Sequence, residues 1–308
     1  MPDSFRDARL TERRNPRTAA IDIATPLEIV DLIGAEDAGV PGTVAGARAE
    51  LARAIELLEA AFRAGGRLVY VGAGTSGRLG VLDAAECPPT FGTPPDMVLA
   101  VIAGGTQALV RSIEGAEDDV NAGIAAMDDR RVGSRDVVVG IAASGTTPFV
   151  RAALGRAQAL DARTVLVTSA DPPPLLRDTC DVVIFVPVGP EVVTGSTRMK
   201  AGTATKLVLN TLTTGAMIRL GKTYGNLMVD LKAWNEKLVD RSQRIVMEAT
   251  GLAREPAREV LAAADGQVKT AIVMARRGVE REEAERLLSA SGGHLRIIVG
   301  DPPSVEPA

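Results

Sequence analysis

Several short apolar runs recur through the middle of the chain, at 67–72, 97–103, 136–142, 163–168 and 181–188. Each run is apolar nearly throughout instead of alternating, as expected for strands that are covered on both faces. Helical patterns lie before or between the runs, at 44–63, 117–128 and 147–160. The alternation of strands and helices predicts an α/β fold, in which right-handed crossovers join an open parallel sheet flanked by helices.

The segments outside this pattern predict further parts of the molecule. Residues 196–220 predict a long buried helix, and 223–250 are expected to continue as helix. Glycines near 266, 278 and 292–293 predict the turns of a small helical module, and a proline-rich tail is expected to be disordered. The expected organisation is an N-terminal arm at 1–45, a sheet domain with flanking helices at 46–250, a helical module at 251–298 and the tail at 299–308.

Composition and charge exclude several classes of protein. The 308 residues carry a net charge of −4 with both signs interspersed, so no basic stripe indicates a nucleic-acid surface. No apolar run reaches the ~18 residues of a membrane span, and the N-terminus lacks the apolar stretch of a signal peptide. Cys87 and Cys180 are too few for a disulfide framework. We therefore expect a soluble cytoplasmic protein that binds neither nucleic acid nor membrane.

A glycine-rich turn follows the first apolar run. Residues 72–77 spell Gly-Ala-Gly-Thr-Ser-Gly, which matches the G-x-G-x-x-G pattern of dinucleotide sites. Such sites also need an acid at the end of the next strand, and the run 97–103 ends in glycines instead. The backbone N–H groups of the turn, with the hydroxyls of Thr75 and Ser76, predict a small-anion site at a helix N-terminus. We interpret the turn as a phosphate site without a nucleotide.

Two further hydroxyl-rich turns have similar chemistry. One follows the run 136–142 and contains Ser144, Gly145, Thr146 and Thr147. The other, 194–197, contains Ser196 and is expected to open the long helix. Each turn alone is typical of an ordinary helix cap, but three of them beyond the strands of one sheet favour a polyhydroxylated, phosphorylated ligand. None has the Gly-Lys-Ser/Thr ending of a nucleoside-triphosphate loop, so a sugar phosphate fits better than ATP.

Candidate acids come from two segments. Glu86 lies just before Cys87-Pro88-Pro89, where the helix is expected to end, and the helix dipole disfavours an acid there. The second group is Glu114, Glu117, Asp118 and Asp119. A solvated helix end and a charged first helical turn explain these acids as well as a site does. Two carboxyls that met over a sugar phosphate would form an acid/base pair.

Metal chemistry has little support in the sequence. His294 is the only histidine, and no spacing of histidine and cysteine matches a zinc site. We expect no metal and no cofactor.

Several blocks resemble N-acetylmuramic acid 6-phosphate etherases, in the same order along the chain. They are 11–16, 72–92, 114–118, 142–148, 189–206 and 226–230. The resemblance extends from about residue 11 to residue 298. It implies a sugar isomerase (SIS) domain with a five-stranded parallel sheet flanked by helices, a small C-terminal helical module and a homodimer.

The resemblance also implies an activity and a set of site residues. The activity is that of a carbon–oxygen lyase of the hydro-lyase type, which cleaves the D-lactyl ether of N-acetylmuramic acid 6-phosphate in cell-wall amino-sugar recycling. Glu86 and Glu117 match the catalytic carboxyls, and Glu114 matches a position expected to contact sugar hydroxyls. The ligand-facing turns are matched by Thr75, Ser76, Ser144, Gly145, Thr146, Thr147 and Ser196.

Two alternative functions use the same fold, and the lactyl carboxylate of the expected substrate has no assigned partner. A non-catalytic regulator that senses sugar phosphates would need the turns without the chemistry, and an aldose–ketose phosphate isomerase would leave the ether intact. Arg78, Arg198 and Lys200 are candidate partners of the lactyl carboxylate, although each is also explained as a surface charge.

Overall fold

The computed structural model describes residues 10–231 and 236–304. The chain forms two compact units. The first, here called the sheet unit, comprises Met1–Ala84 and Asp96–Thr213, and the second, the helical unit, comprises Ala85–Pro95 and Thr214–Ala308. The helices α4 (Gly74–Phe91) and α8 (Lys200–Arg219) belong partly to each. The division of the chain into the four expected segments stays a prediction.

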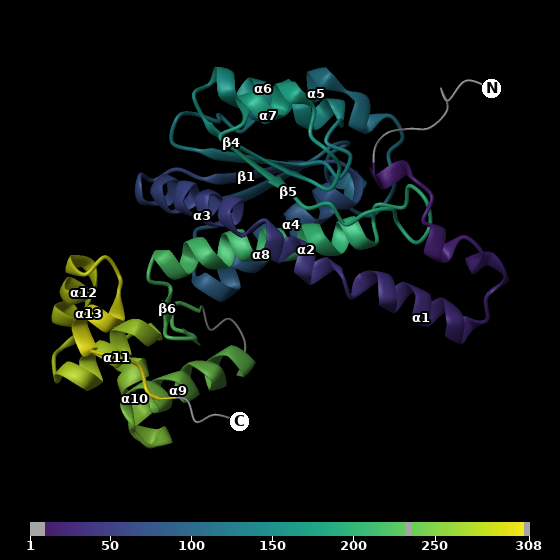
Figure 1. Ribbon diagram of the computed structural model, residues 1–308. Helices are drawn as coiled ribbons and strands as arrows, with labels where there is room; N and C mark the ends of the chain where they lie inside the picture. The colour runs from purple at the N-terminus through teal and green to yellow at the C-terminus, as the bar shows by residue number, and fades with distance from the viewer. Residues whose placement is uncertain (1–9, 232–235, 305–308) are drawn as a thin grey trace, which may run out of the picture. The chain divides into compact units, whose positions relative to one another are not determined.

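The sheet unit is built on a parallel sheet of five strands in the order β2-β1-β3-β4-β5 (Figure 1). The strands are β1 (Leu68–Gly72), β2 (Val98–Ile102), β3 (Val137–Ile141), β4 (Arg163–Thr168) and β5 (Val182–Phe185). Every predicted strand is therefore present, and the predicted α/β fold with a five-stranded parallel sheet is confirmed.

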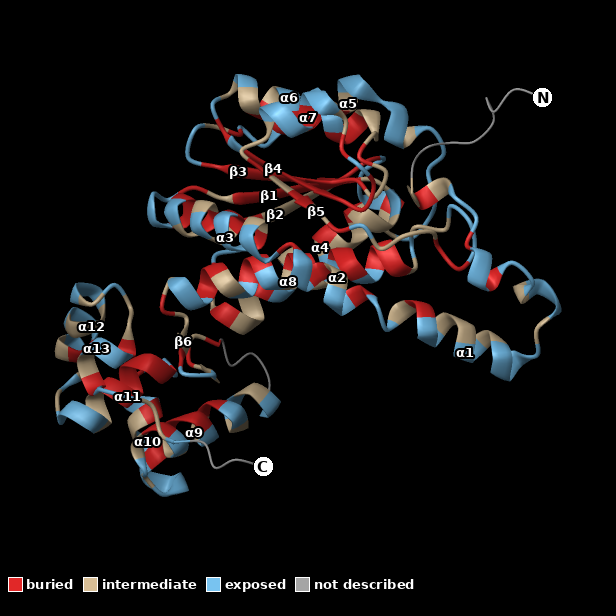
Figure 2. Ribbon diagram, viewed as in Figure 1, coloured by how far each residue is buried: buried red, intermediate tan, exposed pale blue. Residues whose placement is uncertain are grey.

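Helices cover both faces of the sheet, which explains why its strands are apolar nearly throughout. One layer holds α5 (Val120–Asp129), α6 (Pro148–Ala159) and α7 (Pro174–Thr179), and the other holds α3 (Arg48–Arg63) with the first parts of α4 and α8 (Figure 1). All residues of β1 and β3 are buried between these layers (Figure 2). The predicted helices at 44–63, 117–128 and 147–160 correspond to α3, α5 and α6.

A buried polar group fixes α4 on the sheet. The Asp83 carboxylate of α4 accepts hydrogen bonds from the Tyr70 hydroxyl of β1 at 2.9 Å and from Asn210 Nδ2 of α8 at 2.7 Å. A buried carboxylate needs such partners, because an unpaired one is costly to remove from water. This contact orients the N-terminal turns of α4, which lie beside the site.

The N-terminal arm consists of short helical pieces. Three 3-10 turns, η1 (Leu10–Glu12), η2 (Pro16–Thr18) and η3 (Ile21–Ile23), precede α1 (Pro26–Asp37) and α2 (Val40–Gly46). Helix α1 begins with a reciprocal cap, in which Thr25 accepts from the Glu28 amide and the Glu28 carboxylate accepts from the Thr25 amide.

The helical unit has its own core. It contains the hairpin strands β6 (Thr223–Tyr224) and β7 (Leu227–Met228), followed by α9 (Glu236–Thr250), α10 (Arg254–Ala263), α11 (Val268–Arg277), α12 (Arg281–Ala290) and α13 (Leu295–Val299). Val246, Ile272 and Ala284 are fully buried among these elements. Among the described helices, none is long and apolar enough to cross a membrane.

The structure corrects the prediction of continuous helix over 223–250. Residues 223–228 form the β6–β7 hairpin, and Gly225 at its turn has a φ of +57°. Gly-Asn between two short pairs, Thr223-Tyr224 with high strand propensity and the apolar Leu227-Met228, is a hairpin signal that the helical interpretation overlooked. The Tyr224 hydroxyl donates to the carbonyls of Gly300 and Asp301, at 3.0 and 2.6 Å. Residues 1–9 of the predicted arm, 232–235 of the predicted helix and 305–308 of the predicted tail lie outside the described residues.

Candidate active site

The site lies at the carboxyl edge of the sheet, where the chain changes direction. After β1 the chain crosses to β2 on one side, and it then returns to β3 on the other side of β1. Gly72, the last residue of β1, pairs with Ile102 of β2 and with Ile141 of β3. The turns that leave β1 and β3 therefore start side by side. In open α/β sheets, ligands bind in the crevice at this point.

The turn after β1 depends on close backbone packing. A Cβ on Gly72 would lie 2.6 Å from the Gly77 amide nitrogen, and a Cβ on Gly77 would lie 2.6 Å from Ile102 Cγ1. These glycines let α4 begin directly against the ends of β1 and β2, which explains the G-x-G-x-x-G spelling without a dinucleotide. Thr75 and Ser76, in the first turn of α4, are half-buried at this edge.

The turn after β3 leaves a helix N-terminus without a side-chain cap. Ser144 Oγ accepts from the Thr146 amide at 3.3 Å and from the Thr146 hydroxyl at 3.0 Å. Gly145 has a φ of +68°, which favours glycine. Thr147 occupies the N-cap position of α6, but its side chain makes no capping hydrogen bond. The ordinary-cap explanation therefore fails for Thr147, and the first turn of α6 can offer its N–H groups to an anion.

A cavity of about 280 Å³ opens beyond β1 and β2 in the sheet unit. It brings the first glycine turn together with two of the candidate acids, Glu114 and Glu117. Its walls are Ala73, Gly74, Arg78, Ala103, Ala108, Arg111, Ser112, Ile113, Glu114, Gly115, Ala116 and Glu117. Thr75, Ser76, the hydroxyl-rich turn at 144–147 and Ser196 are not part of this wall.

The structure places the acids of the group 114–119 in different surroundings, which the sequence could not distinguish. Glu114 and Glu117 line the cavity, whereas Asp119 caps α5 by accepting from the Ala122 amide at 2.8 Å. Gly115 allows this arrangement, because its φ of +73° turns the chain between the two glutamates. Glu117 lies on η5 (Ala116–Asp118), a 3-10 turn that packs against α6. Glu117 thus lies on an element in contact with the helix that follows the second hydroxyl-rich turn.

Arg78 shapes the cavity wall. Its guanidinium donates to the carbonyls of Leu109 and Arg111, at 3.1 and 3.0 Å. These bonds hold the loop that leads to Glu114 against the first turns of α4. Arg78 therefore has a structural role. The sequence did not reveal this role, because the partners of Arg78 are backbone carbonyls of a loop that is distant along the chain.

The structure corrects the expected position of Glu86 within its helix. Helix α4 does not end at Cys87-Pro88-Pro89 but continues to Phe91. Cys87 and Phe91 are buried at 3% and 7% exposure, and this packing keeps the last turn helical despite the two missing N–H groups. The argument from an acid at the helix end is therefore wrong. Glu86 is exposed and belongs to the helical unit, so its convergence with Glu117 stays a prediction.

The third turn does not open a helix. Helix α8 begins at Lys200, four residues after Ser196, and its first amides are already occupied. The Glu191 carboxylate accepts from the amides of Lys200 and Ala201, both at 2.9 Å. Glu191 is fully buried, and this burial raises its pKa. Sequence reasoning missed Glu191 as a cap, because it stands nine positions before the helix start instead of one.

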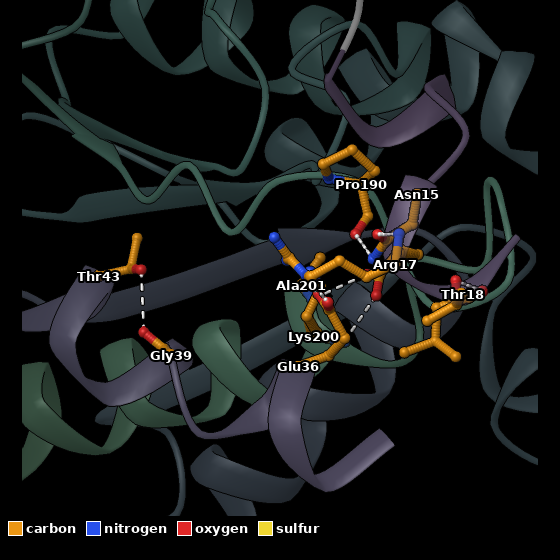
Figure 3. A network of polar contacts seen from close by, with 11 residues as sticks. Asn15, Arg17, Thr18, Glu36, Gly39, Thr43, Pro190, Lys200 and Ala201 are labelled. Carbon is orange, nitrogen blue, oxygen red and sulfur yellow. Dashed lines mark hydrogen bonds and ion pairs between the residues drawn. The ribbon is translucent and has the colours of Figure 1, made fainter. Parts of the chain in front are cut away.

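Lys200 is not available to a ligand. Its ammonium group is buried and lies 2.6 Å from Glu36 Oε2, and Arg17 binds the same carboxylate (Figure 3). The hydrogen bonds from Arg17 chiefly, together with Lys200, lower the pKa of Glu36 to about 2. Of the three candidate partners of a ligand carboxylate, Arg78 and Lys200 thus have structural partners, and Arg198 is exposed.

Comparison with known proteins identifies the family. Residues 50–158 match the family model of the glucokinase regulatory protein N-terminal SIS domain. An N-acetylmuramic acid 6-phosphate etherase of Edwardsiella ictaluri is 53% identical over 266 residues, which cover 86% of this chain and 88% of that protein. One of Gloeobacter violaceus is 54% identical over 263 residues, covering 85% and 86%. The chain belongs to this etherase family.

The family membership confirms the resemblance that the sequence blocks predicted. Among solved structures, the chain is similar to a phosphoheptose isomerase of Neisseria gonorrhoeae, with 19% identity and a TM-score of 0.47. That alignment covers 61% of this etherase-family chain and 96% of the isomerase.

Proposed function

We infer that the protein is an N-acetylmuramic acid 6-phosphate etherase, a carbon–oxygen lyase of amino-sugar recycling. It cleaves the D-lactyl ether of its substrate and yields N-acetylglucosamine 6-phosphate and D-lactate. The observation that carries this inference is the identity of more than half of the aligned positions with etherases along 86% of the chain. The cavity with two acids beside a phosphate-binding type of turn agrees with it.

The turns provide the binding groups for a sugar phosphate. The uncapped start of α6 and the first turn of α4 both present N–H groups at the crevice, and helix N-termini favour anions. Hydroxyls of Thr75, Ser76 and Thr147 suit the phosphate and the sugar. We assign Glu114, on the cavity wall, to the sugar hydroxyls, and Ser196 to a further contact from the segment after β5.

The chemistry follows from the weakness of an ether as a substrate. Direct displacement would expel an alkoxide, which is a poor leaving group. In the open-chain sugar the C2 hydrogen is α to the aldehyde, so a base can remove it. We assign this step to Glu117, and the electron pair left at C2 then expels the lactyl oxygen from C3, which Glu86 protonates. Water adds to the unsaturated aldehyde at C3, and the proton returns to C2.

A homodimer completes this proposal. Glu114 and Glu117 are exposed within one chain, and so are two apolar residues of the same loop region, Val110 at 83% and Ile113 at 40% exposure. Exclusion of water strengthens acid/base and electrostatic catalysis, so a cover over this loop is needed. We propose that a second copy supplies it and that the enzyme acts in the cytoplasm. Light scattering on the purified protein tests the dimer.

The reaction is tested by D-lactate release from N-acetylmuramic acid 6-phosphate, combined with exchange of the C2 hydrogen in deuterated water. Glu117→Gln should lose both signals, by about 10²–10⁴-fold for one acid/base group. Glu86→Ala should lose D-lactate release and keep the exchange. Asp118→Asn is the matched control, because Asp118 shares the 3-10 turn of Glu117 but does not line the cavity.

The outcomes separate the alternatives. Wild-type protein that binds the sugar phosphate without releasing D-lactate would be a regulator, and one that yields a ketose phosphate would be an isomerase. Loss of exchange in Glu86→Ala together with retained exchange in Glu117→Gln would reverse the two assignments.

A further inference from the structure

The N-terminal arm is bonded to the segment 190–201, which leaves the sheet after β5. Asn15 Nδ2 donates to the Pro190 carbonyl at 3.3 Å, and the Thr18 hydroxyl donates to the Val192 carbonyl at 2.8 Å. Both arm residues are buried, at 4% exposure each. The arm therefore packs against the first part of this segment through buried hydrogen bonds (Figure 3).

The same arm holds the later part of the segment. The Gly195 amide donates to the Thr11 carbonyl at 3.2 Å, and the Lys200 ammonium donates to Glu36 at 2.6 Å. The Glu36 carboxylate also accepts hydrogen bonds from the Arg17 guanidinium (Figure 3). One carboxylate on α1 thus joins α1 and η2 of the arm to the start of α8. The arm thus contacts the segment before and after Ser196.

The segment needs this support because little else fixes its middle. Val193, Thr194 and Gly195 are exposed, and Gly195 has a φ of +75°. The amides of Ser196, Thr197 and Met199 donate to the carbonyls of Val193, Gly195 and Ser196, at 2.9, 2.9 and 3.1 Å, but these bonds close only local turns. The position of the Ser196 hydroxyl is therefore set by the bonds of the arm to Val192 and Gly195 before it and to Lys200 after it, together with the Glu191 carboxylate that joins the start of the segment to α8.

Glu36 is the group that makes the arm hard to detach. Its side chain and that of Lys200 are both 2% exposed. A buried charge that loses its partner is strongly disfavoured, so neither residue can leave the other while the fold persists. Asn15 and Thr18 contribute neutral hydrogen bonds, which are weaker than charge-assisted ones.

We propose that Glu36 is a positioning residue for substrate binding. It locks the N-terminal arm onto the segment 190–201 and thereby places the Ser196 hydroxyl at the carboxyl edge of the sheet. The proposal rests on the proposed function, which assigns Ser196 to the substrate. Loss of Glu36 should raise KM by about tenfold, which corresponds to the free energy of about one hydrogen bond. It should change kcat much less, because Glu86 and Glu117 lie on other elements.

The test is a double-mutant cycle between Glu36→Gln and Ser196→Ala. It measures kcat and KM for D-lactate release and, by calorimetry, Kd for N-acetylglucosamine 6-phosphate. If Glu36 acts through Ser196, the double variant and Ser196→Ala should have the same KM and Kd within about twofold. Additive effects would overturn the proposal, as would unchanged KM and Kd in Glu36→Gln. Asp128→Asn, which breaks the exposed pair with Arg156 in the same unit, is the control.

A second variant keeps the test valid if Glu36→Gln does not fold. Thr18→Val keeps the shape of the side chain and removes only its hydrogen bond to the Val192 carbonyl, so KM should rise about threefold, again not additively with Ser196→Ala. Wild-type protein that binds the product but releases no D-lactate would refute the reaction alone, and Kd would then decide the positioning role. Wild-type protein that binds no sugar phosphate would refute both.

Discussion

Replacing Glu36 by glutamine removes one buried negative charge and keeps the size of the side chain. In the folded protein the pKa of Glu36 is about 2, against an ordinary value of 4.5. This difference corresponds to about 3 kcal/mol in favour of the ionised form when the chain is folded. Glutamine imitates the protonated acid, so Glu36→Gln should lower the free energy of unfolding by about 3 kcal/mol at pH 7.

The lowered pKa of Glu36 determines the direction in which its contribution to stability changes with pH. Because the folded-state pKa is lowered, the contribution of Glu36 is fully present above pH 4.5 and is lost as the pH falls toward 2. The difference between wild type and Glu36→Gln should therefore be constant from pH 7 to about 5 and fall to about half by pH 3. Urea unfolding followed by far-ultraviolet circular dichroism at each pH measures it.

A second substitution tests the stated cause. Glu36→Gln leaves the Lys200 ammonium buried without its carboxylate, whereas Glu36→Gln combined with Lys200→Met removes both charges. The double variant should be more stable than Glu36→Gln, because an unpaired buried charge costs more than the absence of the pair. A difference between wild type and Glu36→Gln that stays the same from pH 7 to pH 3 would refute the electrostatic reasoning.

Gly77→Ala should destabilise the protein by about 1–3 kcal/mol, because the new Cβ would lie 2.6 Å from Ile102 Cγ1. Gly155→Ala, in α6 with nothing within 4 Å of the new Cβ, should instead raise the free energy of unfolding by about 0.5–1 kcal/mol. Equal changes in the melting temperatures of the two variants would contradict the packing argument. Glu191→Gln should lower the free energy of unfolding by about 1–3 kcal/mol, since the two α8 amides bond to different carboxylate oxygens and one of these becomes an NH2 donor; unchanged melting would refute the cap. Gly115→Ala should cost about 1–2 kcal/mol and reduce kcat/KM for D-lactate release, and full activity would show that the left-handed turn does not hold the acids.

The sheet could be predicted from the sequence because burial on both faces leaves a signal within each strand. The run 136–142, for example, needs no knowledge of distant residues to be recognised as β3. The same local logic placed the first two hydroxyl-rich turns after β1 and β3, but it wrongly placed the third at the start of α8. It failed at 223–228, where two local signals competed and a Gly-Asn hairpin turn outweighed a helical pattern. It failed again at Pro88, where the tertiary packing of Cys87 and Phe91 outweighed the local helix-breaking signal.

The walls of the site could not be predicted, because they depend on contacts between distant parts of the chain. Glu114 and Glu117 line the cavity since Arg78 holds the loop before them by backbone carbonyls, which leave no trace in sequence spacing. Lys200 is a candidate ligand partner by sequence alone, but its ammonium is paired with Glu36, which stands 164 positions away in the chain. Local patterns thus suggested candidate residues, and tertiary pairing decided that the charge of Lys200 is not free to bind a ligand.

The two prolines of α4 have a mechanical consequence. A proline lacks the amide hydrogen that would bond the carbonyl four residues earlier, so Pro88 and Pro89 leave the carbonyls of Ala84 and Ala85 outside the helical ladder. This interruption falls where the chain passes from the sheet unit to the helical unit, between those same two alanines. The helix is least stiff there, one residue before Glu86, and its two unused acceptors must be solvated or bonded by whatever occupies that surface.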